Sequence, residues 1–444
     1  MDTHLKPTAA LARLIATTTF SDIPSDVVRA AKTAILDGVA VMVAGTVQQP
    51  ARLVRKYVEA LGGPPVATVI GGGFKTNTPN AAFANGVSGH VLDYEIQGFP
   101  PTHGTSSCLP AALALAEQLK APGARVITAY VLGWEIQGRL RAASAHATNP
   151  AFHPPGLVGP LGGAAASANI LGLDTDHAHT ALAIAATRTG GLTANTGTMV
   201  KSTHPGNAAR MGVEAALLAD VGFNATRDIL EVPTGYAAAL FDGDINWDIV
   251  LAGLGSTWRL VDPGFRIKRF PAQIHMQNPT EAVLNLRAKH NISPETVERL
   301  QIKTDSEGHS GALPRSGLDG KFSIEYCAAA ALLDGEVTIS TFTDKRRFSP
   351  DMEAVLPRIV VERMDAPGDV TLAVAYLANG TIVQEQCRSY TGSTIRPMAT
   401  DMHLEKVRDC LSQSLSHEQT EALITQLMSL EDVEDITTML RLIN

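Results

Sequence analysis

Hydrophobic side chains recur at intervals of three to four residues along most of the chain from about residue 9 to 260. This spacing places them on one face of an α-helix, so it predicts a series of helices. The predicted segments are Ala9–Thr18, Pro24–Ala44, Gln49–Leu61, Asn80–Leu92, Cys108–Leu119, Ala124–Ala143, Leu161–Leu171, Asp174–Ala186 and Asn207–Val221. Many are rich in alanine, whose small side chain lets helix axes approach closely. We therefore expect a large helical bundle.

The pattern changes after Pro271. Alternating or β-branched runs predict strands at Glu298–Thr304, Ile359–Arg363, Val370–Leu377 and Thr381–Arg388. The last two runs flank Asn379-Gly380, which favours a hairpin with a type I′ turn. Helical patterns at Pro279–His290 and Phe322–Leu333 lie between the strands.

These patterns predict a mainly α protein with a second, α+β domain. We expect a large helical domain at 1–267 and a small domain with an antiparallel sheet at 268–395. Residues 396–444 are expected to form helices that return to the large domain.

Composition narrows the classes of function. Of the 444 residues, 45% are hydrophobic and 18% charged, which indicates a folded globular protein. The net charge of −8 comes without a basic block, so no nucleic-acid partner is expected. No run of ~20 uncharged apolar residues and no signal-peptide pattern occurs, which predicts a cytoplasmic protein without a membrane partner. The four cysteines are far apart, which argues against a disulfide framework and a zinc site: Cys108, Cys327, Cys387 and Cys410.

Polar clusters between the apolar runs are the candidates for chemistry. Asp93 and Glu95 follow a predicted helix and lead to His103, and such a group can form an acid/base network. His153 precedes Pro154 and a helix of small residues, where a ligand can approach helix N-terminal amides. Each segment could equally be structural, with Asp93 capping a loop and each histidine satisfied by its surroundings.

Three further clusters carry cations or an aromatic hydroxyl. Lys201 and His204 lie in a glycine-bounded loop suited to binding a carboxylate, although a solvated lysine is the simpler interpretation. Lys268 and Arg269 lie at the predicted domain boundary, where a cleft is expected, and could neutralise a polycarboxylate or form a basic linker. Tyr326 opens an apolar helix and could be an ordinary core residue.

In this order and at these separations, the clusters resemble the MmgE/PrpD family over nearly the whole chain. The family includes 2-methylcitrate dehydratases, cis-aconitate decarboxylases and iminodisuccinate epimerases. The matching positions are Asp93, His103, His153, Lys201, His204, Gly206, Ala208, Ala209, Lys268 and Tyr326. The resemblance implies a homodimeric enzyme in which Asp93, His103, His153 and Tyr326 serve proton transfer. Lys201, Lys268 and Arg269 would bind carboxylates.

Two departures from the family pattern bear on the reaction. Glu95, Ile96 and Gln97 occupy positions where the family has Asp-Asp-Thr. Gln273 stands where decarboxylases have a histidine, and His275 is an open substitute, so Gln273 is taken as a substrate-binding candidate. Epimerisation needs no acid for a leaving group, and the chain therefore most resembles the epimerase branch.

No metal or organic cofactor is expected, since no cofactor-binding motif occurs. The predicted function is abstraction of a proton next to a carboxylate of a small di- or tricarboxylate, with epimerisation of an iminodisuccinate as the first hypothesis. Dehydration of a 2-methylcitrate-like acid, decarboxylation of cis-aconitate type and non-catalytic polycarboxylate binding are the alternatives.

Overall fold

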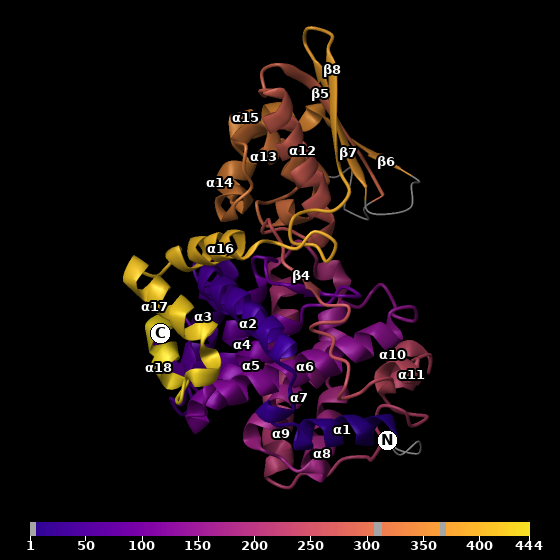
Figure 1. Cartoon of the computed structure of the whole chain (residues 1–444), viewed down its shortest axis with the longest axis vertical. Helices are drawn as coiled ribbons and strands as arrows, with labels where there is room; N and C mark the ends of the chain where they lie inside the picture. Colours follow the sequence, from indigo (N-terminus) through magenta and orange to yellow (C-terminus); the bar gives the residue numbers. More distant parts are fainter. Residues whose placement is uncertain (1–5, 306–312, 365–369) are drawn as a thin grey trace.

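The computed structural model describes residues 6–305, 313–364 and 370–444. A large helical part carries a smaller part of helices and strands, drawn above it in Figure 1. This confirms the predicted fold class of a mainly α protein with a second α+β unit. Within the described residues, no helix is both long and apolar enough to cross a bilayer.

The large part contains the helices predicted from periodicity. They are α1 (Pro7–Thr17), α2 (Ser25–Gly45), α3 (Gln49–Leu61), α4 (Thr78–His90), α5 (Gly104–Leu119), α6 (Gly123–Ser144), α7 (Pro154–Leu171), α8 (Thr175–Ala186) and α9 (Thr203–Asp220). Two short helices, α10 (Tyr236–Phe241) and α11 (Trp247–Leu251), were not predicted. Several begin earlier than predicted, most clearly α7, which starts with Pro154 in its first turn rather than at Leu161. Proline is favourable there because its missing N–H has no partner in the first turn.

Two short strand pairs in this part were not predicted. Strand β1 (Ala67–Val69) pairs with β2 (Phe74–Thr76), and β3 (Gln97–Gly98) pairs with β4 (Phe265–Arg266). Each strand has only two or three residues, which is too short to show an alternating pattern. The second pair matters for the site, because it ties the loop after α4 to the chain that leads into the small part.

Glycines allow the central helices to cross closely. A Cβ added at Gly212 of α9 would lie 2.3 Å from the backbone carbon of Gly163 in α7. One added at Gly86 of α4 would lie 2.8 Å from the Cα of Gly206 in α9. Larger side chains would push these helices apart, so the glycines hold together the helix ends that carry the polar clusters.

The small part is built on a four-stranded sheet with the order β6-β5-β7-β8. Its strands are β5 (Val297–Thr304), β6 (Ile359–Arg363), β7 (Thr371–Leu377) and β8 (Ile382–Cys387). The sequence predicted an antiparallel sheet, but the sheet is mixed. β5 and β6 pair in parallel, whereas the other two pairings are antiparallel. Helices α12 (Gln277–His290) and α13 (Ile324–Asp334) share a hydrophobic core with the sheet, and the short α14 (Asp344–Arg347) and α15 (Pro350–Val355) lie nearby.

The hairpin between β7 and β8 occurs as predicted, but its turn differs. A type I′ turn needs positive φ at both central residues, and only Gly380 has one, at 82°. The Gly380 amide donates to the Leu377 carbonyl at 2.9 Å, and the Leu377 amide donates to Thr381 at 2.9 Å. This is the pattern of a three-residue loop that ends on a left-handed glycine.

The C-terminal helices pack on the large part. These are α16 (Thr400–Ser412), α17 (His417–Met428) and α18 (Thr437–Leu440), drawn in yellow beside α2 and α3 in Figure 1. Val407, Cys410 and Leu423 belong to the same hydrophobic core as α2, whereas the small part has a core of its own. We propose domain limits of 1–267, 268–395 and 396–444 on this basis.

A buried ionic cluster fastens α16 to the loop after α4. Asp37 of α2 is fully buried and accepts hydrogen bonds from Lys406 Nζ at 2.6 Å and from the Ile96 amide at 3.1 Å, while His403 Nε2 lies 3.2 Å away. Lys406 Nζ also donates to the Tyr94 carbonyl at 3.0 Å. The loop that carries Asp93 and Glu95 is therefore held from behind by the C-terminal helices.

Replacing Lys406 with methionine is expected to destabilise the protein by about 3 kcal/mol, because removing one partner leaves a buried carboxylate poorly compensated. Urea denaturation measures the difference. Arg408 lies on the same helix as Lys406, and its partly exposed charge pairs with Glu421 of α17. Arg408→Met is therefore the control and should change stability by less than about 1 kcal/mol. Equal stability of both variants would contradict a fastening role for Lys406.

Candidate active site

A cavity of about 320 Å³ lies where the helical part meets the small part. Its size is at the lower end of the range usual for small-molecule sites, roughly 300–1,000 Å³. Five of the residues predicted from sequence line it: Asp93, His103, His153, Lys201 and Gln273. The structure thus brings together side chains from four separate segments of the chain.

Helix ends place these side chains. His103 immediately precedes α5 and His153 immediately precedes α7, so both imidazoles lie at helix N-termini. Lys201 lies in a short 3₁₀ turn, η3 (Met199–Ser202), directly before α9. Asp93 follows α4 in a left-handed conformation with φ of 49°, which is uncommon outside glycine and indicates a tightly specified loop. The close helix crossings described above bring these ends together.

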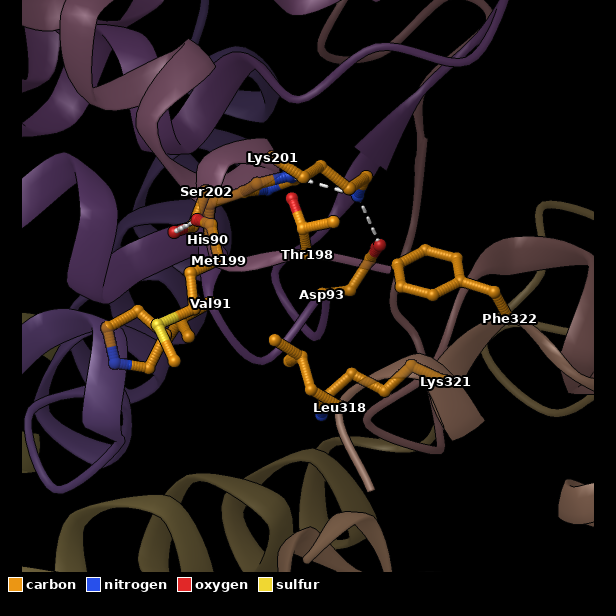
Figure 2. A pocket seen from close by; sticks show the side chains of 11 residues that line it. His90, Val91, Asp93, Thr198, Met199, Lys201, Ser202, Leu318, Lys321 and Phe322 are labelled. Atoms are coloured by element: carbon orange, nitrogen blue, oxygen red, sulfur yellow. Dashed lines mark hydrogen bonds and ion pairs between the residues drawn. The ribbon is translucent and has the colours of Figure 1, made fainter. Parts of the chain in front are cut away.

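Asp93 is the ionic centre of the site. Lys201 Nζ donates to its Oδ2 at 2.6 Å, and Lys268 Nζ donates to Oδ1 and, at 2.7 Å, to the Asp93 carbonyl (Figure 2 shows the Lys201 contact). Burial would raise the pKa of the Asp93 carboxyl, but the two ammonium groups outweigh burial and hold this pKa well below its usual range. Asp93 is therefore an ionised carboxylate held between two lysine ammonium groups.

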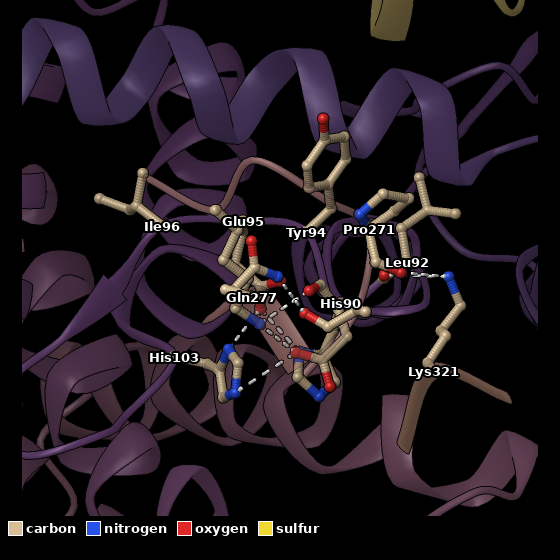
Figure 3. A network of polar contacts seen from close by, with 12 residues as sticks. His90, Leu92, Tyr94, Glu95, Ile96, His103, Pro271, Gln277 and Lys321 are labelled. Atoms are coloured by element: carbon tan, nitrogen blue, oxygen red, sulfur yellow. Dashed lines mark hydrogen bonds and ion pairs between the residues drawn. The ribbon is translucent and has the colours of Figure 1, made fainter. Parts of the chain in front are cut away.

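Glu95 links two histidines (Figure 3). His90 Nδ1 lies 2.6 Å from Glu95 Oε1, and Ser106 donates to the same oxygen at 3.0 Å. His103 Nδ1 lies 2.9 Å from it, within ion-pair distance although not aligned for a hydrogen bond. Burial would raise the pKa of Glu95, but the imidazoles outweigh burial and hold this pKa well below its usual range. Glu95 is thus a carboxylate that orients His103 toward the cavity.

Two histidines of the site, His90 and His153, are kept neutral. Burial, with the nearby Lys201 ammonium, lowers the pKa of His90 to about 4. The same two causes hold the pKa of His153 well below its usual range, and His153 Nδ1 lies 3.1 Å from His204 Nδ1. His204 therefore contacts His153 but does not itself line the cavity. A neutral His153 can donate one hydrogen bond and accept another.

Besides His204, three of the predicted residues lie outside the cavity lining. Lys268 is fully buried and is bound to Asp93. Arg269 lies 3.2 Å from Glu281 in the small part. Tyr326 is buried in the small core, where its hydroxyl donates to the Thr341 carbonyl at 2.5 Å. We therefore assign Arg269 and Tyr326 no contact with substrate.

Sequence reasoning missed Lys321. It reaches from the small part across the junction, and its Nζ donates to the Leu92 carbonyl at 3.1 Å and the Pro271 carbonyl at 3.0 Å. Together with Asp93, Lys201 and Phe322 it lines a second cavity of about 20 Å³, shown in Figure 2, which is large enough for about one water molecule. Its position directly before the apolar helix containing Tyr326 was the available signal, since charged residues in apolar surroundings are rarely accidental.

The buried Lys321 predicts a pH-dependent stability. Burial lowers its pKa to about 7 from an ordinary value of 10.5. Between these values the unfolded chain binds more protons at this position, so this lysine destabilises the fold below pH 7 and the penalty falls as pH rises toward 10. Lys321→Met is expected to have its most favourable effect on the melting temperature near pH 6 and a smaller one near pH 9. A difference that does not vary with pH, measured by scanning calorimetry, would contradict this.

Two groups of side chains have metal-binding geometry. The ligand atoms of His90, His103 and His153 lie within 4.8 Å of one another, and so do those of Asp93, Glu95 and His103. The Lys201 ammonium lies 3.1 Å from His90 Nε2 and 2.6 Å from Asp93. The Lys201 ammonium therefore places a positive charge beside both groups, as a bound metal ion would.

Comparisons with known proteins match nearly the whole chain. The profile of the MmgE/PrpD N-terminal domain matches residues 9–248, and that of the C-terminal domain matches residues 270–431. A cis-aconitate decarboxylase from Mus musculus is 31% identical over 94% of this chain and 89% of its own length. Those from Homo sapiens and Aspergillus terreus are each 30% identical, over 94% and 95% of this chain and 90% and 93% of their own lengths. With both domain profiles matched and relatives aligned over nearly its full length, the chain belongs to the MmgE/PrpD family.

Proposed function

We propose that this protein is a cofactor-independent carboxy-lyase that removes carbon dioxide from cis-aconitate or a closely similar unsaturated tricarboxylate. The observation that carries the proposal is the cavity in which Lys201 and two histidines surround a space for a small acid, with Asp93 fixing the lysine. The relatives named cis-aconitate decarboxylase favour this reaction over the epimerisation suggested by the residue departures.

The reaction is a decarboxylation with a shift of the double bond. In cis-aconitate, the double bond is β,γ to the carboxylate on the saturated carbon. When the bond between this carboxylate and the saturated carbon breaks, its electron pair forms a new terminal double bond. The electron pair of the former double bond moves to the carbon next to a remaining carboxylate, which gives a dienolate. A proton then adds to that carbon, giving carbon dioxide and itaconate. The enzyme must therefore stabilise a dienolate and deliver one proton.

The geometry suits both tasks. The Lys201 ammonium lines the cavity, and we assign it to the carboxylate that becomes the dienolate. His103 lines the same cavity and has the Glu95 carboxylate behind its imidazole, so we assign it as the proton donor. His153, held neutral, is assigned to a hydrogen bond with the substrate.

Epimerisation of an iminodisuccinate is the second candidate, and one observation favours it. Gln273 lines the cavity where decarboxylases of this family carry a histidine, and an amide cannot transfer a proton. An epimerase would need only a base and an acid on opposite sides of the substrate, which His103 and His153 could supply.

A substrate panel distinguishes the candidates. The purified protein is incubated separately with cis-aconitate, iminodisuccinate stereoisomers and 2-methylcitrate, and products are identified by proton NMR. Terminal methylene signals with release of carbon dioxide from cis-aconitate alone would support the carboxy-lyase. Interconversion of iminodisuccinate stereoisomers without loss of carbon would replace it with the epimerase, and conversion of none would contradict both.

A further inference from the structure

We propose that Arg141 binds the carboxylate on the central carbon of the substrate, which is neither the one lost nor the one assigned to Lys201, and that it makes the cavity selective for tricarboxylates over dicarboxylates. The inference rests on the proposed function for the identity of the reacting end, but the ligand selectivity can be measured without any reaction.

Arg141 belongs to the last turn of α6 and lines the cavity that also holds Lys201, His103 and His153. Its Nε donates to the Pro101 carbonyl at 3.2 Å, and its Nη1 donates to the Thr148 hydroxyl at 2.9 Å. Both partners are neutral. Across residues 6–305, 313–364 and 370–444, no carboxylate lies within ion-pair distance of this guanidinium.

Arg139 shows how a buried guanidinium on this helix is compensated by an anion. Arg139, two residues earlier on the same helix, is buried and contacts the Glu135 carboxylate. A partly buried cation without an anion is unfavourable, and burial lowers the pKa of Arg141. An incoming carboxylate would remove this deficit, and the flat guanidinium can bind it through two parallel hydrogen bonds.

Two side-chain amides in the same cavity point to a polar ligand. Gln97 and Gln273 both line it, and the Oε1 atoms of both are buried with no hydrogen-bond partner in the described part of the chain. Buried polar atoms are rarely left unpaired, so these amides point to a polar ligand. Each amide also carries N–H donors for a carboxylate oxygen.

The arrangement therefore has two cationic positions, Lys201 for the reacting end and Arg141 for another carboxylate. A simple structural role is the rival explanation, because Arg141 also fixes Pro101, which lies in the loop leading to His103. The two explanations differ in which ligands they affect.

Isothermal titration calorimetry with two inert acids tests the proposal. Tricarballylate is a saturated tricarboxylate, and glutarate is the same molecule without its central carboxylate. Arg141→Met is expected to weaken tricarballylate binding about 10- to 100-fold, as for loss of a charge-assisted contact, and to change glutarate binding less than about threefold. Arg210→Met is the matched control, since Arg210 pairs with Glu214 and does not line the cavity.

An equal loss for both acids would show a structural role and overturn the proposal. So would unchanged tricarballylate binding in the variant, or a wild-type protein that binds the two acids equally. If Arg141 proves selective while the substrate panel shows no decarboxylation, the proposed function falls and this inference stands. If decarboxylation occurs without Arg141-dependent selectivity, the reverse holds.

Discussion

Lys201→Met is expected to lower kcat/KM for cis-aconitate by about 10³-fold, one of the two largest effects that we predict for a single substitution. The Lys201 ammonium lines the cavity and would face the dienolate. Its loss also leaves Asp93 with Lys268 as its remaining lysine partner, so an anionic carboxylate would be less well screened from the substrate. Steady-state kinetics with detection of carbon dioxide measures the effect.

Lys32→Met provides the control for charge loss, because Lys32 pairs with Glu431 away from the cavity and should leave kcat/KM within about twofold. Circular dichroism of the Lys201 variant must show a folded protein. A folded Lys201 variant that keeps more than a tenth of the activity would contradict the assignment.

His103→Gln is expected to lower kcat by about 10²- to 10⁴-fold with a smaller change in KM, because glutamine can form hydrogen bonds but cannot deliver a proton. Glu95→Gln should lower kcat less, by about tenfold, since it removes the group that orients His103 while retaining the imidazole. The test is whether His103→Gln lowers kcat more than Glu95→Gln does, with kcat measured in stopped or continuous assays.

The exposed His177 on α8 supplies the matched histidine control, and His177→Gln should not change kcat. If His153→Gln lowers kcat as much as His103→Gln while Glu95→Gln has no effect, His103 would not be the proton donor and the two histidines would have to exchange roles.

The sequence predicted the helices and the clusters well because both depend on local pattern. Apolar spacing located α3 at Gln49–Leu61 and β6 at Ile359–Arg363 with the observed limits. The four loop clusters meet because helix ends carry them, and short motifs such as His153-Pro154 mark a helix start.

Contacts between distant segments could not be predicted in this way. Glu95 looked like a departure from the family pattern, yet the structure uses its carboxylate to contact both His90 and His103. Arg269 was grouped with Lys268 because the two are adjacent in sequence, but neighbouring side chains in an extended segment point to opposite sides. One reaches Asp93 and the other reaches Glu281.

Conversion of cis-aconitate in D₂O, followed by proton NMR of the product, is the most direct test of the proposed carboxy-lyase mechanism. We predict itaconate with one deuterium in its saturated methylene group and none in its terminal =CH₂ group, and we expect His103→Gln to suppress this product. Deuterium on the terminal =CH₂ carbon would show that the double bond does not shift. Exchange of deuterium into an acid that keeps all its carbons would show proton abstraction without decarboxylation, and either result would contradict the proposed carboxy-lyase mechanism.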